Sequence, residues 1–162
     1  MLEIYADYQC PACIWYNKNI VTPVIVKEFV DTNKLTLSYK QFPLQMHQNA
    51  RGDALAALCA HAEGKFKEYK EWIYSLEEKK RGDDTSDTER IELAKTLGLN
   101  ETTFTQCLKE QHYSKKIDAD MMDGNKAGLQ GTPTFILDGK MVDNKVFQDP
   151  ASTRQFLQNV LK

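Results

Sequence analysis

The spacing of apolar residues changes twice along this chain, and these changes restrict the possible fold more than any other feature. Residues 2–6 and 34–42 alternate apolar and polar side chains, as half-buried strands do. Residues 11–29 lie between them with apolar residues at helical spacing. Pro11 suits a first helical turn, and Pro23 is expected to kink or split the helix. Strand, helix and strand in this order indicate a right-handed parallel crossover.

A block of helices is expected in the middle of the chain. Residues 49–62 are rich in Ala and Leu and end near Gly64, a good left-handed stop. Ser86 and Glu89 have capping-box spacing and open a further helix. Other predicted segments are helices over 66–76, 100–108 and 113–126 and a charged, solvated loop over 79–85. We therefore predict one domain, residues 1–162, with a helical insertion over about 47–127.

Strand periodicity returns in the last part of the chain. Residues 134–137 and 140–147 read as two strands, and Asp138-Gly139 between them is a strong hairpin signal. Asp149-Pro150 opens a closing amphipathic helix. The predicted order is β-α-β, a helical block and β-β-α, which is an α/β fold.

Composition excludes several classes of protein. The 162 residues include 21 Lys and Arg and 23 Asp and Glu, a net charge of −2, with 41% hydrophobic residues. Such a chain can bury its own core and has no charge excess that would favour nucleic acid or an anionic membrane. No apolar run approaches the ~18 residues of a membrane span. We expect a monomer without a signal peptide, although a secreted protein written without its leader would look the same.

The motif with the clearest chemistry is Cys10-Pro11-Ala12-Cys13, between the first strand and the first helix. A first helical turn offers free N–H groups and the positive end of the helix dipole, and both stabilise a thiolate. The pKa of Cys10 is therefore expected well below the ~8.5 of a free cysteine. Cys10 would be the nucleophile, and Cys13 would reach back to resolve a mixed disulfide.

Zinc binding is the alternative for this motif. A closed zinc site needs four ligands, and Cys59 and Cys107 stand on separate predicted helices without paired ligands. The strand–helix context favours the redox interpretation. We expect no metal and no other cofactor.

A second motif is Gly131-Thr132-Pro133-Thr134, which places a proline at the head of a strand, where it cannot donate to the ladder. An ordinary trans proline is the common case, because only ~5–6% of X–Pro bonds in folded proteins are cis.

Five stretches resemble the DsbA-type branch of the thioredoxin superfamily, in the family's order over nearly the whole chain: YADYQCPAC, QFPLQMHQNA, AALCAHAEGKFKEY, FTQCL and GTPTFILDGK. The resemblance implies a thioredoxin fold with an all-helical insertion between its βαβ and ββα halves. Cys10 and Cys13 match the redox pair. Pro133 matches the family's cis-proline, and Thr132 matches the residue whose backbone pairs with substrate.

The resemblance also implies function and location. It implies a thiol:disulfide oxidoreductase that introduces disulfides into unfolded or partly folded secreted proteins, outside the cytoplasm, in the periplasm or cell envelope. A redox partner, in the membrane or not, would re-oxidise the pair. An apolar substrate rim is expected near Tyr8, Ala12 and Pro133. Cys59 and Cys107 would form a second, structural disulfide as in some relatives, or would remain two buried free thiols.

Two departures from the family pattern affect the expected chemistry. Relatives often carry a buried acidic residue where this chain has Ile4, and the neighbouring Glu3 points to the opposite face of a strand. The dipeptide Pro11-Ala12 lacks the His that can help stabilise a thiolate. We therefore expect a less extreme oxidant, with the reduced form somewhat more stable than the oxidised form.

Other functions stay open at this level. A reductase or isomerase would use the same thiol chemistry, and Thr132 is shared with isomerase relatives. Those relatives usually dimerise through an added domain, for which this chain has no spare sequence. A non-catalytic, peptide-binding thioredoxin-like module is a further alternative, but it would not need two thiols at the start of a helix.

Overall fold

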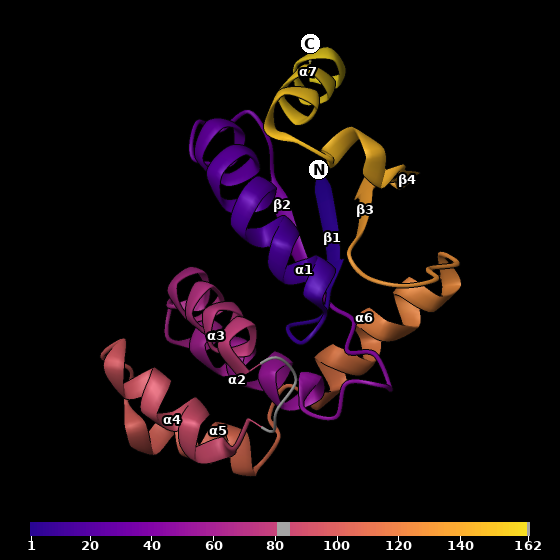
Figure 1. Ribbon diagram of the computed structural model, residues 1–162. Helices are drawn as coiled ribbons and strands as arrows, with labels where there is room; N and C mark the ends of the chain where they lie inside the picture. Colours follow the sequence, from indigo (N-terminus) through magenta and orange to yellow (C-terminus); the bar gives the residue numbers. More distant parts are fainter. Residues whose placement is uncertain (81–84, 162) are drawn as a thin grey trace.

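A single four-stranded sheet forms the centre of the computed structural model, which describes residues 1–80 and 85–161 (Figure 1). The strand order is β2-β1-β3-β4. Strand β1 (Leu2–Ala6) pairs in parallel with β2 (Leu37–Gln41) and antiparallel with β3 (Thr134–Leu137). Strand β4 (Lys140–Val142) adds antiparallel to β3. The expected order of β-α-β, helical block and β-β-α is confirmed.

The central strand β1 is covered on both faces. Leu2, Ile4 and Ala6 point into the main core, whereas Tyr5 packs in a second, smaller cluster with Met121 of the sixth helix. Because side chains alternate along a strand, Glu3 lies on the face opposite to Ile4, as expected. The face of the sheet toward the main core therefore offers no acidic side chain from β1.

The first helix is continuous but changes its winding. Helix α1 (Pro11–Tyr16) runs directly into η1 (Asn17–Val30), a wider helix in which the N–H of Asp31 bonds the carbonyl of Val26 at 2.8 Å. The expectation that Pro23 kinks or splits the helix is wrong. The winding changes at Asn17 instead, and the wider turn accommodates a proline ring that would crowd the preceding turn of an α-helix.

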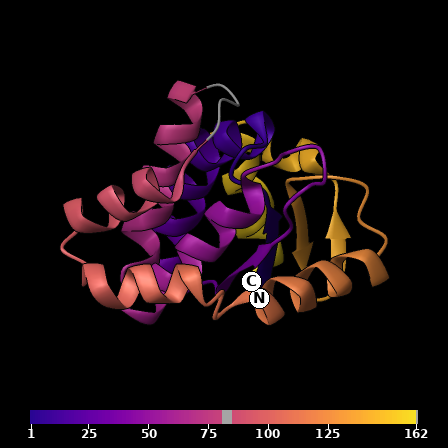
Figure 2. The ribbon, with the colours of Figure 1, turned by 90° about the horizontal axis from the view of Figure 1, so that it is seen from below.

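Five helices follow β2, from Ala50 to Lys126. They are α2 (Ala50–Ala62), α3 (Phe66–Lys80), α4 (Asp87–Thr96), α5 (Glu101–Lys109) and α6 (Ser114–Lys126). Helices α2 to α5 gather below the sheet in Figure 1, and Figure 2 shows α4 and α5 at the opposite end of the molecule from the β3–β4 hairpin. None of the described helices combines the length and apolarity needed to cross a membrane.

Helix α2 lies at the centre of this block because its side chains are small. Ala54, Ala56, Ala57 and Ala60 are each no more than 1% exposed. Small side chains let neighbouring helices approach closely, and α2 packs against both α3 and α5. The composition of this segment thus sets the tight packing of the block.

The predicted solvated loop over 79–85 is wrong at both of its ends. Helix α3 continues to Lys80, and residues 81–84 lie outside the described residues. Thr85 is buried, and its hydroxyl donates to Glu77. A side-chain acceptor on α3 therefore draws this end of the loop inward. The predicted capping box follows as expected, with Ser86 and Glu89 bonding each other's backbone N–H groups.

The predicted hairpin is present, but its second strand is shorter than expected. Asp138 and Gly139 have φ angles of 48° and 78°, as a two-residue turn of this kind requires. The strand expected over 140–147 ends at Val142, because Asp143 caps a 3₁₀ turn, η2 (Asn144–Phe147). This turn buries Phe147. The closing helix α7 (Pro150–Val160) then begins at Asp149, as predicted.

Candidate active site

The two cysteines of the first motif lie in the first turn of α1, where the chain leaves β1. Cys10 is the residue that caps the helix, and its carbonyl accepts the first helical hydrogen bond, from the N–H of Ile14, at 3.0 Å. Pro11 follows at a position where its missing N–H is no loss. Cys10 is 7% exposed and Cys13 2% exposed. Both are free thiols, and Cys10 is the more exposed of the two.

The environment of Cys10 favours its thiolate. The pKa of Cys10 is lowered to about 5, and the largest cause is the hydrogen bond from the Cys13 thiol. Burial opposes this shift, whereas Thr132 and the backbone N–H groups of Cys13 and Ala12 contribute to it. The depressed pKa was expected from the N–H groups of the helix start. Sequence reasoning did not anticipate that the largest contribution comes from the partner thiol.

Cys13 has the opposite character. Burial raises the pKa of Cys13 well above 9, and the adjacent Cys10 raises it further. The N–H of Asp7 points at the Cys13 sulfur at 3.5 Å, and its effect opposes this rise. One thiol of the pair is thus held ready to ionise and the other is kept protonated.

The second motif meets the first across the sheet. The Cys10 thiol lies 3.3 Å from the carbonyl oxygen of Thr132, 122 residues away in the sequence. The Thr132–Pro133 bond is cis, as the resemblance implied. Asn144 of η2 donates to the Pro133 carbonyl at 2.9 Å and holds this segment from behind. The structure therefore brings Cys10, Cys13, Thr132 and Pro133 together.

The apolar rim was expected near Tyr8, Ala12 and Pro133, and these three residues differ in exposure. Tyr8 is 1% exposed, because its ring turns inward and packs on the ring of Tyr74 with centroids 4.9 Å apart. Pro133 is also buried, and only Ala12 is exposed. The large apolar side chains on this side are instead Trp15, 45% exposed, and Met46, 80% exposed.

These two exposed side chains border a groove of about 830 Å³ beside the motif. One wall is formed by Pro11, Ile14 and Trp15, and the other by the segment 46–49 and the end of α3. The groove runs from the redox motif to the helical block.

A buried carboxylate stands directly before the motif. Asp7 is 1% exposed, and its Oδ1 accepts the N–H groups of Gln9 at 2.7 Å and Cys10 at 3.2 Å. Its Oδ2 accepts the N–H of Leu44 and the Nδ1–H of His47, at 2.7 and 2.8 Å. The sequence analysis missed this residue. An Asp whose side chain bonds the backbone two residues on is a known turn signal, and it could have been found in Asp7-Tyr8-Gln9.

Gln9 links the same turn to the helical block. Its side-chain oxygen accepts the N–H of Asn49 at 2.9 Å, and its amide donates to Glu77 of α3 at 3.2 Å. Gln9 is largely buried. The residue before Cys10 is therefore held by the start of α2 and by the end of α3, which both lie far from it in the sequence.

A polar cluster fills the interior on the far side of Cys13. Tyr39 and Tyr74 bond through their hydroxyls at 2.5 Å, and the Lys70 ammonium lies 5.4 and 5.8 Å from the centres of their rings. Burial raises the pKa values of both tyrosines well above 10 and lowers that of Lys70. The tyrosines stay neutral, so they line the interior near Cys13 without adding negative charge.

Comparison with known proteins agrees with this geometry. A family model described as thioredoxin matches residues 1–159. This chain belongs to the thioredoxin family. Disulfide bond formation protein D of Bacillus subtilis (strain 168) is 26% identical over 98% of this chain and 71% of that protein. This thioredoxin-family chain has the DsbA-like form of the fold, with the helical block inside it.

Two solved structures have the same fold. Oxidised BdbD from Bacillus subtilis matches with a TM-score of 0.80 at 23% identity, over 99% of this chain and 86% of that one. The MdbA protein, a thiol-disulfide oxidoreductase from Actinomyces oris, matches with a TM-score of 0.81 at 17% identity, over 98% of this chain and 78% of that one.

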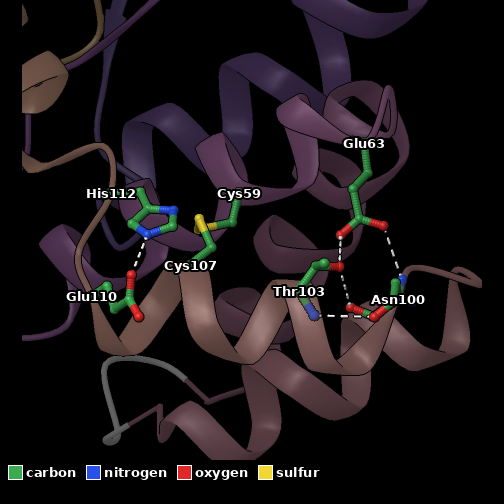
Figure 3. The surroundings of a disulfide bond; sticks show 7 residues. All are labelled: Cys59, Glu63, Asn100, Thr103, Cys107, Glu110 and His112. Carbon is green, nitrogen blue, oxygen red and sulfur yellow. Dashed lines mark hydrogen bonds and ion pairs between the residues drawn. A yellow bond between two sulfur atoms is a disulfide. The ribbon is translucent and has the colours of Figure 1, made fainter.

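The other two cysteines of this thioredoxin-family chain form a disulfide within the helical block (Figure 3). Cys59 of α2 and Cys107 of α5 are 6.0 Å apart at their Cα atoms. Next to the bridge, Glu63 at the end of α2 accepts the N–H of Asn100 at 2.9 Å and the hydroxyl of Thr103 at 3.3 Å (Figure 3). The bridge therefore ties two helices that are also hydrogen-bonded.

The bridge also bears on the zinc alternative. Cys59 and Cys107 bond each other and so cannot complete a four-ligand site with the first motif. Across residues 1–80 and 85–161, no three His, Cys, Asp or Glu side chains are grouped to hold a metal ion. The arrangement of Cys10 and Cys13 suits thiol chemistry.

Proposed function

We propose that this protein is a thiol:disulfide oxidoreductase that introduces disulfides into unfolded or partly folded secreted proteins. The observation that carries the proposal is the contrast within one helical turn. The pKa of Cys10 is lowered to about 5, whereas that of the buried Cys13 is raised. A thiol that ionises this readily is a good leaving group in disulfide exchange. The name of the Bacillus subtilis relative supports the same activity.

The reaction would begin with Cys10 and Cys13 joined in a disulfide. A substrate thiolate attacks the Cys10 sulfur, the bond between the two sulfurs breaks, and Cys13 leaves with the electron pair and takes up a proton. A second substrate thiolate then attacks the substrate sulfur of the mixed disulfide, and Cys10 leaves as a thiolate. The substrate loses two electrons and gains a disulfide, and the pair holds those electrons as a dithiol.

Substrate would bind beside Cys10 through its backbone. The Thr132 carbonyl, 3.3 Å from the Cys10 sulfur, is the acceptor that an extended peptide would meet there. Pro133 has no N–H and does not compete for that peptide. Backbone pairing recognises any sequence, which suits an enzyme that acts on many unfolded chains.

The remaining parts of the proposal concern the surroundings. We place the protein outside the cytoplasm, as a monomer, with a redox partner that accepts the electrons of the reduced pair. An oxidising compartment is also where a structural disulfide such as Cys59–Cys107 persists. We assign that bridge a structural role, because it lies in the helical block.

The test is oxidation of a reduced, unfolded model protein by the oxidised protein. We expect disulfides to appear in the substrate while Cys10 and Cys13 become reduced. Cys10→Ser and Cys13→Ser should both abolish the reaction, because neither variant can form the Cys10–Cys13 disulfide that oxidises the substrate. With a substrate that already carries a disulfide, the Cys10 thiolate of Cys13→Ser should stay in a mixed disulfide, because the resolving thiol is absent. The equilibrium with glutathione then separates an oxidase from a reductase. A pair as reducing as thioredoxin, at about −270 mV, would replace the oxidase by the reductase or isomerase alternative.

A further inference from the structure

Asp7 has an unusual set of partners for a buried carboxylate. Its four hydrogen bonds all come from neutral or ring N–H donors: three backbone N–H groups and the His47 ring. Two of them belong to the turn before α1 and two to the segment after β2. Among residues 1–80 and 85–161, no lysine or arginine bonds this carboxylate. The carboxylate therefore acts as a clamp between two segments of the chain.

The clamp touches both cysteines through the backbone. The side chain of Asp7 accepts the N–H of Cys10, and the N–H of Asp7 itself points at the Cys13 sulfur. The direction of that N–H depends on how the peptide between Ala6 and Asp7 is held. The side chain that fixes this peptide is the one bonded to Leu44 and His47.

We propose that Asp7 is a positioning residue for the redox pair. Its clamped side chain aims its own N–H at Cys13, and this makes the pair more oxidising. The inference rests on the proposed thiol–disulfide exchange. A thiolate or a thiol that shares its proton accepts a hydrogen bond better than a disulfide sulfur does. The N–H contact therefore stabilises the reduced form more than the oxidised form.

Asparagine at position 7 keeps the shape of the side chain but removes part of its hydrogen bonding. Each carboxylate oxygen accepts at least one backbone N–H group, so in either orientation the amide nitrogen of Asn would face a backbone donor. The volume is nearly unchanged, but at least one of the backbone hydrogen bonds must be lost. Asp7→Asn should therefore release the turn and weaken the contact to Cys13.

The charge of Asp7 would act in the opposite direction. A carboxylate close to two sulfurs disfavours a thiolate, so removal of the charge alone would make the pair more oxidising. Asp7 is not among the main causes of the shifted pKa of Cys10. We therefore expect the loss of positioning to outweigh the loss of charge. The two effects shift the equilibrium between disulfide and dithiol in opposite directions, so one measurement distinguishes them.

The experiment is the equilibrium of the pair with reduced and oxidised glutathione at pH 7, for the full chain. In Asp7→Asn we expect the equilibrium constant to shift about tenfold toward the Cys10–Cys13 disulfide. Asp123→Asn, which removes an exposed carboxylate of α6, is the matched control and should leave it unchanged. An Asp7→Asn value within twofold of the wild type, or a shift toward the dithiol, would overturn the proposal.

His47→Gln is the second variant, for the case that Asp7→Asn does not fold. His47 is part of the clamp but partly exposed, so its replacement should be tolerated and should shift the equilibrium in the same direction, by two- to threefold. An unchanged equilibrium in a folded His47→Gln protein would count against the clamp. A wild type that does not exchange with glutathione at all would contradict the proposed function instead, which keeps the two failures distinct.

Discussion

At the scale of single residues, one helical turn holds two thiols with opposite protonation preferences. Cys13 donates to Cys10, and the same contact lowers one pKa and raises the other. Between about pH 5 and pH 9 the pair therefore carries one thiolate, on the sulfur that a partner can reach. The division of roles between attack and resolution follows from the deeper burial of Cys13 and from the hydrogen bond that it donates to Cys10.

The first prediction concerns this thiolate. In the reduced protein, the ultraviolet absorbance of a thiolate and the rate of alkylation should both rise with a midpoint at about pH 5. Cys13→Ala should move the midpoint upward, because the largest cause of the low pKa is the Cys13 hydrogen bond. Cys13→Ser, whose hydroxyl can still donate, should move it less. A midpoint near 9 in the wild type would show that Cys10 is an ordinary thiol.

The second prediction concerns Asp53, a carboxyl of α2 that bonds the Arg90 guanidinium at 2.9 Å. Burial raises the pKa of Asp53 to about 7 although Arg90 opposes it. A raised pKa means that the protonated form is favoured on folding, so stability is complete below the usual value of about 4 and falls as pH rises through 7. That loss is on the order of 4 kcal/mol.

Urea unfolding at pH 5 and pH 8 measures this effect. The wild type should lose stability between the two values, and Asp53→Asn should lose markedly less because position 53 no longer titrates. Asp87→Asn changes the exposed carboxylate on the same arginine and should retain the wild-type dependence. Equal pH dependence in Asp53→Asn and the wild type would contradict the assignment.

Residues were predicted well from the sequence where a local signal existed. The spacing of Cys10 and Cys13 indicated a redox pair, and the spacing of Ser86 and Glu89 indicated a helix cap. Asp7 was missed because its role depends on Leu44 and His47, which only the folded chain brings to it. The rim was expected near Tyr8, and nothing in the segment around Tyr8 reveals that its ring turns inward onto the ring of Tyr74.

At the scale of elements, the type of each segment could be predicted, but several ends could not. The ends that were wrong are those decided by distant contacts. The strand expected to reach residue 147 stops at Val142, since the buried rings of Phe135 and Phe147 meet with centroids 4.3 Å apart. Thr85 leaves the predicted solvated loop because Glu77 accepts its hydroxyl. Periodicity carries no information about such partners.

The third prediction belongs to the helices α2 and α5. Replacing both Cys59 and Cys107 by Ala removes a covalent link between residues that are 48 positions apart in the sequence. The free energy of unfolding should fall by up to roughly 4 kcal/mol, since the unfolded chain regains the entropy that the bridge removed. Urea unfolding of the double variant against the wild type measures this loss.

The exchange activity is the control for that variant. The bridge joins helices of the block and does not contact Cys10 or Cys13, so the double variant should still oxidise a reduced substrate below its unfolding midpoint. A double variant as stable as the wild type would show that the bridge does not constrain the chain. Lost activity in a folded double variant would contradict the structural role.

At the scale of the whole molecule, the redox state of one pair should change the stability of the fold. The lowered pKa of Cys10 stabilises the reduced protein, fully at pH values above about 9, and this gain is lost as pH falls through about 5. The oxidised protein has no thiolate to stabilise. The fourth prediction is therefore a higher melting temperature for the reduced form, by several degrees at pH 8, with the difference shrinking toward pH 4.

Thermal melts of both redox forms at the two pH values test this. The Cys10→Ser, Cys13→Ser double variant should melt at the same temperature with and without reductant, which also checks that Cys59–Cys107 stays closed. A more stable oxidised form at pH 8 would mean that the pair is a poor oxidant.

Because Cys59 and Cys107 form a disulfide, this protein is itself a substrate for the kind of thiol oxidation that we propose it performs. Each newly made copy has to give up two electrons at these cysteines before α2 and α5 are joined. Forming this disulfide needs the same two-electron oxidation that the oxidised Cys10–Cys13 pair would carry out on other proteins. An oxidised, folded copy would therefore form the Cys59–Cys107 disulfide in a newly synthesised copy, and the rate at which finished protein appears would rise with the amount already present.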